Sequence, residues 1–507
     1  MSAASPKLNG EMSETAPIPT TARPDHDTGS GGLTPAHKLV IWLLVGSAFV
    51  VFLNETVVGV ALPRIMASLE IDAASVQWLM TAYMLTMAVV IPMSGFLIRR
   101  YSTRRIFLAA MTLFVIGTAL CAIAPGFEVL VGGRVVQAMG NGVMMPLLMT
   151  TVMELVPPRD RGRMMGRVAI VMAAAPALGP MVGGLVLTAF DWRAIFLIIL
   201  PIAIAALIVG ILKVRNVLDP EDVRTDLLSV LLAALGFGGL VFGLTELGHA
   251  VEGKAIVEPL YPVLVGAVML ALFVWRQLRL QQDDRALIDL RILAVPGYLW
   301  SILCVVMLCA ILFGTIVLLP IYTQQSLGYS EFESGLMMLP GGLLMGFAGP
   351  IVGRWYDRLG PRPLVVPGAI IATGALWLMA MFYTIDATFW TVVGLHILLS
   401  AGLALLFSPL FTAGLGSLPG RLIPYGSAML GTTQQLAGAA GTAALVALYT
   451  VTSTTALGQG ASAPEAIATG VHTAYLVTAC AFVLLIGLAF LVRRPEGELS
   501  GPPVAGH

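Results

Sequence analysis

The chain has 507 residues, of which 58% are hydrophobic and only 11% are charged, and its mean hydropathy is +0.90. This composition excludes an ordinary soluble globular protein. The 28 basic and 28 acidic residues balance, so the net charge gives no reason to expect a nucleic-acid partner. The four cysteines fall in apolar runs without a CxxC spacing, which argues against a metal or redox site.

Apolar segments follow one another along almost the whole chain. Residues 1–37 are polar and are expected to form a disordered cytoplasmic tail, and residues 495–507 are expected to form a second cytoplasmic tail. A lipid-spanning helix needs about 20 mainly apolar residues, because its backbone amides must bond within the segment. Fourteen runs meet this requirement, and they are expected to begin near Leu39, Val76, Arg105, Glu128, Met164, Arg193, Asp226, Pro259, Pro296, Phe332, Pro363, Phe389, Pro424 and Val471.

The basic residues orient these spans. If the N-terminus is cytoplasmic, all but four of the 28 Lys and Arg residues fall in the tails and loops that face the cytoplasm. The exceptions are Arg64, Arg193 and Lys254, which are assigned to the outside, and Arg134, which lies within a span. Because Lys and Arg concentrate on the cytoplasmic side, both termini are predicted to be cytoplasmic and the number of spans to be even.

An internal repeat divides the chain. The segments 95–104 and 353–362 share a Gly- and Arg-rich pattern, and the pairs Leu62–Pro63 and Leu319–Pro320, expected at the end of a span, recur at nearly the same spacing. This spacing exceeds six spans with their loops, so two additional spans are expected between duplicated halves. The predicted units are a six-helix half at 38–213, two additional helices at 214–291 and a second six-helix half at 292–494.

Five motifs carry a family resemblance: Leu53–Pro63, Gln77–Tyr83, Arg134–Gln137 with Gly140, Gly179–Gly184 and Asp191–Arg193. On these motifs the chain resembles the major facilitator superfamily, specifically its fourteen-span drug:proton antiporter branch. The resemblance implies an all-α integral membrane fold of 6+2+6 helices in a bacterial plasma membrane. It also implies a monomer that has no cofactor and is driven by the proton gradient.

The resemblance has departures that bear on mechanism. The family often has Asp where this chain has Asn54, and a carboxylate follows as Glu55. In the first loop motif the usual Asp is Arg99 and the second Gly is Ser102, so only the later copy, with Asp357, keeps the full pattern. A symmetrical gate is therefore not expected.

Two charged residues are candidates for proton coupling. A charge inside the bilayer is costly, so Glu55 is expected to line a cavity or to be paired. Burial disfavours the anion, which would let Glu55 exchange a proton; a structural ion pair or an interfacial position is the alternative. Arg134 cannot shed its charge and needs a partner. The resemblance implies that it biases the protonation of a nearby acid, and a fixed structural pair is again the alternative.

Other residues are assigned to a cavity, an exporter motif and a gate. Polar and thioether groups inside spans could contact a ligand, although interhelical bonds and core packing explain them as well. The residues of the predicted cavity are Asn54, Glu55, Met84, Gln137, Asn141 and Gln434. The exporter motif, which the resemblance implies seals the transport route, comprises Pro176, Gly179, Pro180, Gly183 and Gly184; ordinary small-residue packing is the alternative.

The repeated loop motif predicts a cytoplasmic gate that latches to the opposite half by ion pairs and a helix end. Its alternative is that the charges only set the orientation in the membrane. The predicted gate residues are Gly95, Arg99, Arg104, Gly353, Asp357, Arg358, Gly360 and Arg362.

These features together predict a secondary transporter rather than an enzyme. No phosphate-binding loop or HExxH sequence is present. The expected activity is export of drugs or other lipophilic organic compounds by proton antiport and alternating access. Export of one endogenous metabolite, lipid or siderophore is the alternative, and uptake is a further one. The expected partners are organic small molecules, protons and the lipid bilayer.

Overall fold

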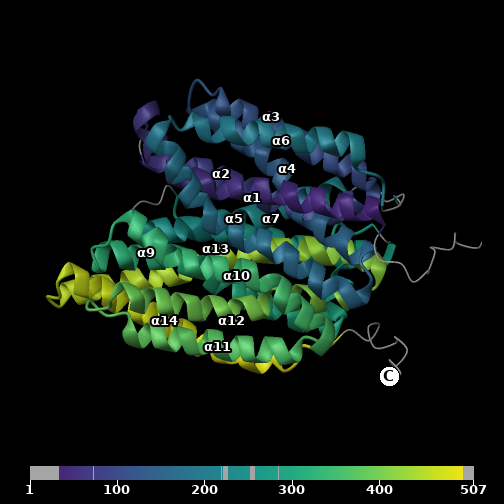
Figure 1. Cartoon of the computed structure of the whole chain (residues 1–507). Helices are drawn as coiled ribbons and strands as arrows, with labels where there is room; N and C mark the ends of the chain where they lie inside the picture. Colours follow the sequence, from purple (N-terminus) through teal and green to yellow (C-terminus); the bar gives the residue numbers. More distant parts are fainter. Residues whose placement is uncertain are drawn as a thin grey trace, which may run out of the picture.

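The protein is a bundle of long α-helices (Figure 1). The computed structural model describes residues 34–71, 73–217, 220, 226–251, 257–283 and 285–494. Within these residues lie fourteen α-helices: α1 (Pro35–Leu69), α2 (Ala73–Arg100), α3 (Thr103–Ala122), α4 (Phe127–Leu155), α5 (Arg161–Ala189), α6 (Arg193–Lys213), α7 (Leu227–Val251), α8 (Leu260–Leu280), α9 (Pro296–Ile321), α10 (Glu331–Leu359), α11 (Arg362–Phe382), α12 (Phe389–Gly416), α13 (Ile423–Gly458) and α14 (Ala463–Ala489).

Short helical turns connect some of these helices. Four are 3-10 turns, η1 (Pro158–Asp160), η2 (Gln281–Asp283), η3 (Leu290–Ala294) and η5 (Gly420–Leu422), and η4 (Tyr322–Ser326) is a π-helical turn. The predicted tail 495–507 lies outside the described residues, as does the tail 1–37 up to residue 33. Thr34 caps α1 by accepting a hydrogen bond from the backbone N–H of His37.

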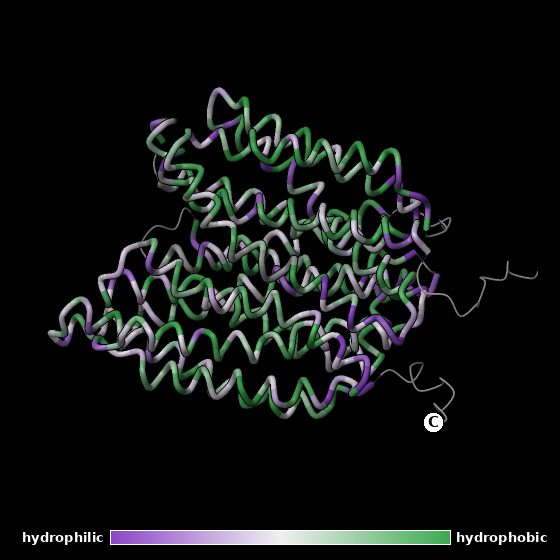
Figure 2. Tube along the Cα trace, in the orientation of Figure 1, coloured by the Kyte–Doolittle hydropathy of each residue, from purple (hydrophilic) through white to green (hydrophobic). Residues whose placement is uncertain are grey.

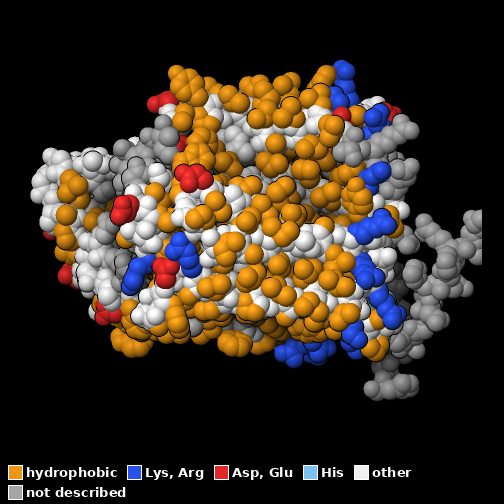
Figure 3. Space-filling view, turned by 90° about the horizontal axis from the view of Figure 1, so that it is seen from above, with side chains coloured by type: hydrophobic (Ala, Val, Ile, Leu, Met, Phe, Trp, Pro, Cys, Tyr) orange, Lys and Arg blue, Asp and Glu red, His pale blue; other side chains and the backbone are white. Residues whose placement is uncertain are grey.

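The helices have the composition of membrane spans. Among the described residues, thirteen carry an apolar stretch long enough to cross a bilayer; α5, some of whose side chains are outside the description, is the fourteenth helix. Figure 2 shows hydrophobic residues along the helices and hydrophilic residues near their ends. A row of Lys and Arg side chains lines one end of the molecule, at the right of Figure 3, which is the cytoplasmic end. The predicted all-helical membrane fold is confirmed.

One predicted start differs clearly from the structure. Helix α14 begins at Ala463 rather than near Val471, because Ser462 and Glu465 form a capping box before the apolar run. The apolar stretch of α1 ends at Leu62, at the Leu62–Pro63 pair as predicted, while the helix itself continues to Leu69. A helix can extend beyond the apolar run that crosses the membrane, as the first turns of α14 and the last turns of α1 do.

The helices pack in two groups of six, each with its own internal contacts. In the N-terminal group α1 packs on α5, α3 on α4 and α6, and α2 on α4; in the C-terminal group α9 packs on α13, α12 on α10 and α11, and α14 on α11 and α13. The groups occupy opposite sides of the bundle in Figure 1. They meet where α5 packs on α10 and where α2 packs on α13.

Helices α7 and α8 form a hairpin of their own. They approach closely because their contact is made through glycines: a Cβ on Gly236 would lie 3.0 Å from the backbone N of Leu270, and one on Gly239 would lie 3.0 Å from the Cα of Gly266. Helix α7 contacts both α2 and α13. The hairpin therefore covers one of the two seams between the six-helix groups.

Candidate functional site

A hydrogen-bonded network lies around Glu55 in the interior of the N-terminal group. Glu55 of α1 is half-buried, and its Oε2 accepts a hydrogen bond from Asn141 Nδ2 of α4 at 3.0 Å. The same amide nitrogen donates to the hydroxyl of Tyr83 in α2 at 2.6 Å. Asn141 thus joins three helices at one point, and Tyr83 is fully buried there.

Arg134 lies on the other side of Tyr83. It is fully buried, and its guanidinium carbon lies 3.9 Å from the centroid of the Tyr83 ring. Its Nη1 donates to Gln137 Oε1 at 3.1 Å, and its Nε donates to the Leu79 carbonyl at 3.4 Å. No carboxylate among the described residues forms an ion pair with Arg134. Stacking on an aromatic face is a favourable setting for a desolvated guanidinium.

Gln137 extends the network to a further helix. Its Nε2 donates to Thr118 Oγ1 of α3 at 2.8 Å, while its Oε1 accepts from Arg134. The residues Arg134, Gln137 and Asn141 follow one another at helical spacing on α4, which places them on one face. The chain of contacts therefore runs from Thr118 through Arg134 and Tyr83 to Glu55.

The structure brings three residues of the predicted cavity into this network and gives the others different contacts. Glu55, Asn141 and Gln137 come together in the network. Asn54 is fully buried, and neither atom of its side-chain amide has a hydrogen-bond partner. Met84 is half-buried on α2 next to Tyr83, whereas Gln434 of α13 contacts Cys309 of α9 in the other helix group.

The exporter motif packs α5 against α1 beside Glu55. Thr56 Oγ1 donates to the carbonyl of Ala175 at 3.3 Å, and a Cβ on Gly179 would collide with the Thr56 side chain. A Cβ on Gly183 would lie 3.1 Å from Val57, whereas one on Gly184 would meet nothing within 4 Å. Pro176 and Pro180 are within α5, but their side chains are outside the described set. A larger side chain therefore has no room at Gly179, and Gly183 is in close contact with α1, the helix that carries Glu55.

One latch of the predicted gate uses a helix end. The Asp357 carboxylate of α10 accepts hydrogen bonds from the backbone N–H groups of Gly162 at 2.7 Å and Arg163 at 2.8 Å. These N–H groups belong to the first turn of α5, whose own N-cap residue, Asp160, makes no capping bond. A negative charge is favourable at this position, because it meets the free N–H groups and the positive end of the helix dipole.

At the seam between α2 and α13, the halves are joined by an arginine–tyrosine contact instead of a helix cap. Arg99 of α2 donates to the hydroxyl of Tyr425 in α13, and its guanidinium lies 5.0 Å from the centroid of that ring. Gly95 lies against the same helix: a Cβ there would be 3.0 Å from the Pro424 carbonyl and 3.2 Å from Ala428. Arg99, which stands where the family often has Asp, therefore makes a contact across the halves with an aromatic side chain.

Only part of the predicted gate reaches the opposite half. Gly353 does so, because its Cα faces the backbone of Gly162 in α5. Arg104 donates instead to the carbonyl of Ile211 in α6 at 2.8 Å, and Arg362 donates to that of Val492 at 3.2 Å, each within its own half. Arg358 is exposed, and Gly360 forms the positive-φ turn that ends α10.

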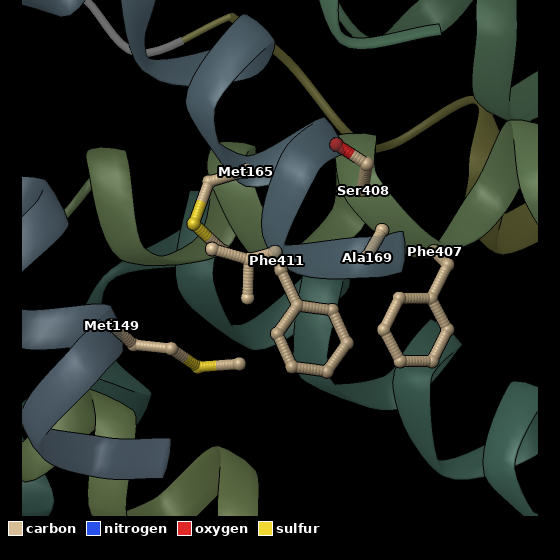
Figure 4. A pocket seen from close by; sticks show the side chains of 7 residues that line it. Met149, Met165, Ala169, Phe407, Ser408 and Phe411 are labelled. Carbon is tan, nitrogen blue, oxygen red and sulfur yellow. The ribbon is translucent and has the colours of Figure 1, made fainter. Parts of the chain in front are cut away.

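The two halves also contact each other next to the Asp357 and Arg99 contacts. Thr150 of α4 and Ser427 of α13 share a buried hydrogen bond of 2.8 Å. Nearby, Met149 and Met165 face Phe407 and Phe411 of α12, whose rings stack at 4.8 Å (Figure 4). The space among these side chains is apolar and has no room for a water molecule. The two halves are thus packed directly against each other at these side chains.

Sequence reasoning missed three residues of this arrangement. Tyr83 and Thr118 belong to the Glu55–Arg134 network, and Tyr425 is the partner of Arg99. Tyr83 closes a motif of the second span, which is a signal for it. Nothing in the sequence marks Thr118 or Tyr425, because each gains its role from a contact with another helix.

A sequence model of the Major Facilitator Superfamily matches residues 44–442. The chain belongs to the major facilitator superfamily. The superfamily relatives include the lincomycin resistance protein LmrB of Bacillus subtilis, 36% identical over 90% of this chain and 95% of that protein. They also include a multidrug resistance protein B homolog of Mycobacterium tuberculosis, 31% identical over 86% of this chain and 81% of that protein.

Solved structures show the same superfamily fold. The human organic anion transporter MFSD10 matches with a TM-score of 0.62 at 15% identity, covering 90% of this chain and all of that chain. As a member of this superfamily, the chain is a multi-pass membrane transporter and not an enzyme. Its resemblance to drug-resistance members of the superfamily is confirmed.

Proposed function

We propose that this transporter exports lipophilic organic compounds in exchange for protons and that Glu55 carries the coupling proton. The observation that supports this most is the setting of Glu55. It lies half-buried in an apolar span, bonded to the neutral amide of Asn141, and no Lys or Arg among the described residues forms an ion pair with it. A carboxyl group without a fixed cation can alternate between charged and neutral forms.

The side chains around Glu55 can form hydrogen bonds with both its charged and its neutral carboxyl group. Asn141 donates to the Glu55 carboxylate, and its Oδ1 has no hydrogen-bond partner, so a rotated amide can accept a hydrogen bond from the O–H of a neutral Glu55. Arg134 is held behind Tyr83, within electrostatic reach of Glu55 but not in contact with it. Its fixed positive charge favours release of the proton when the substrate cavity opens to the cytoplasm.

The direction of transport rests on the exporter motif and on the relatives. Gly179 and Gly183 seal α5 against α1 next to Glu55, so an apolar leak along this helix pair is opposed. The relatives named for lincomycin resistance and multidrug resistance support organic compounds as substrates. In the exchange, a proton reaches Glu55 from outside while the cytoplasmic side is sealed, and an organic compound replaces it after the halves rock.

The test is proton release from acid-loaded inverted membrane vesicles upon addition of lipophilic cations and lincomycin. The intact protein is compared with Glu55→Gln, which keeps the size of the side chain, and with Asp191→Asn, which removes an exposed carboxylate outside the site. Release by the intact protein and by Asp191→Asn, but not by Glu55→Gln, supports the proposal. Equal release by all three would reject Glu55 as the coupling group, and no release with any compound would reject drug:proton antiport.

A further inference from the structure

The two helices of the α7–α8 hairpin are joined at their cytoplasmic end by a partly buried polar network. Asp226, just before α7, binds Arg276 of α8 through Nε at 2.6 Å and Nη2 at 2.8 Å. Ser229 Oγ donates to the same carboxylate and accepts from Gln277 Nε2 at 2.8 Å. Ser229 and Gln277 are fully buried, whereas the Asp226–Arg276 ion pair is partly exposed. It fixes the two helices to each other at one end.

Gln277 also holds the segment that leads to α9. Its Oε1 accepts hydrogen bonds from the backbone N–H groups of Leu287 at 2.6 Å and Ile288 at 3.3 Å. The side chains of both residues are buried. The segment is therefore bonded to the hairpin rather than lying free at the membrane surface.

The same segment reaches the gate through Tyr425. The Tyr425 hydroxyl donates to the carbonyl of Ala286 at 3.4 Å while it accepts from Arg99 of α2. One chain of hydrogen bonds therefore runs from Arg99 through Tyr425 and the backbone of 286–288 to Gln277 and the hairpin. Tyr425 is almost completely buried, which prevents water from replacing these bonds.

The other end of the hairpin contacts the N-terminal half. Phe242 of α7 lies 5.9 Å from Trp78 of α2, measured between ring centroids. Between the two ends, α7 follows the seam between α2 and α13. The hairpin is thus hydrogen-bonded, through residues 286–288, to the C-terminal half at its cytoplasmic end, and it is in aromatic contact with the N-terminal half toward its outer end.

We propose that the α7–α8 hairpin is a brace that stabilises the closed cytoplasmic gate, with Gln277 and Tyr425 as its positioning residues. They hold the Arg99 contact across the α2–α13 seam when the cytoplasmic side is sealed. Because these bonds join elements on both sides of the seam, their loss shifts the equilibrium toward the state open to the cytoplasm. The proposal rests on the alternating-access part of the proposed function and assigns a role to the two additional helices.

The experiment measures gate opening directly. Thr150→Cys serves as a reporter, because Thr150 is fully buried at the closed interface on α4. Inverted vesicles are exposed to a membrane-impermeant maleimide, and the labelling rate is corrected by that of protein without the reporter. No substrate or proton gradient is added, so the result does not depend on whether drugs or protons are transported.

Tyr425→Phe and Gln277→Leu are the test variants. Each removes buried hydrogen bonds of the chain, and labelling is expected to rise about threefold to tenfold. The matched controls are Tyr322→Phe and Thr373→Val, which remove buried hydrogen bonds within the C-terminal half, to the carbonyls of Thr384 and Phe482. Labelling of the controls is expected to match the unmodified reporter protein.

Two results would contradict the proposal that the hairpin is a brace. One is labelling of both test variants at the rate of the controls. The other is a rise for Tyr425→Phe alone, which would mean that Arg99 and Tyr425 act without the hairpin. Thermal unfolding in detergent is measured in parallel, and a rise that also appears in the controls at equal loss of stability would count against the proposal.

Discussion

Asp357 of the C-terminal half caps the helix of Gly162 in the N-terminal half, with its Oδ1 accepting a hydrogen bond from the Gly162 backbone N–H at 2.7 Å. An N-cap is normally supplied by the residue before the helix, and Asp160 occupies that position without making the bond. The first turn of α5 is therefore completed only while the two halves are together on the cytoplasmic side.

Replacing Asp357 is expected to open the cytoplasmic side. Loss of an N-cap bond costs about 0.5 to 2 kcal/mol, so Asp357→Ala should raise labelling of the Thr150→Cys reporter about twofold to thirtyfold. The labelling rate with Asp357→Asn should lie between those of the unmodified protein and Asp357→Ala, because the Asn amide oxygen still accepts one hydrogen bond but carries no charge. Asp191→Asn, at an exposed site, is the control, and an equal rate for Asp357→Ala and the control would contradict the prediction.

A larger side chain at position 353 should push α10 and α5 apart. A Cβ at this position would lie 2.7 Å from the backbone carbonyl carbon of Gly162, and backbone atoms of a packed helix cannot move aside cheaply. Gly353→Ala is expected to increase reporter labelling and to reduce transport. Gly335→Ala on the same helix, where a Cβ meets nothing within 4 Å, should leave both unchanged.

The exporter motif offers a similar pair of variants. In Gly179→Ala the new methyl group would lie 2.7 Å from Thr56 Cβ, next to Glu55, and overpacking of this kind costs about 1 to 3 kcal/mol. We expect a lower unfolding temperature in detergent and slower export. Gly184→Ala meets nothing within 4 Å and should behave as the unmodified protein. Equal effects of the two variants would show that the α1–α5 contact is not the reason for Gly179.

The Tyr83 ring is expected to matter more than its hydroxyl for stability. Tyr83→Leu removes the aromatic face from Arg134, and a desolvated cation–π contact contributes about 2 kcal/mol. Tyr83→Phe keeps the ring and loses only the bond to Asn141. Thermal unfolding should therefore rank the unmodified protein above Tyr83→Phe and Tyr83→Phe above Tyr83→Leu. The reverse order of the two variants would refute the stacking argument.

The ion pair at the base of the hairpin should be sensitive to acid. The hydrogen bond from Arg276 lowers the pKa of Asp226, which lies outside the apolar spans, to about 2. A carboxyl whose pKa is lowered by folding stabilises the fold above its unfolded pKa of about 4, and this contribution is lost as the pH falls toward 2. Asp226→Asn should therefore be less stable than the unmodified protein near about pH 6, and the difference should shrink near about pH 3. A difference that is independent of pH would contradict this assignment.

The spans and their orientation could be predicted because both follow from composition. A run of apolar residues and an excess of arginine on one side need no knowledge of neighbouring helices. The capping box at Ser462, which starts α14, lies outside the apolar run, so composition does not indicate where this helix begins. The start of the helix depends on the capping side chains, whereas the span depends on the apolar run.

The sequence indicates which site residues share a face of one helix, but not which residues of different helices meet. Arg134, Gln137 and Asn141 share one face of α4, and their spacing indicates this. That Arg134 stacks on Tyr83 and that Arg99 meets Tyr425 depends on the register between helices, which no local pattern encodes. For the same reason, the sequence did not show that Arg104 and Arg362 bind carbonyls of their own halves.

The glycine contact between α7 and α8 also bears on how the protein is made. Gly236 and Gly239 pack against residues of α8, which follows α7 directly in the chain, so this contact needs no part of the C-terminal half. The pair can enter the bilayer and associate while α9 to α14 are still being synthesised. Helix α7 then presents its remaining face before α13 exists, and the last helices of the chain assemble onto a surface that is already formed.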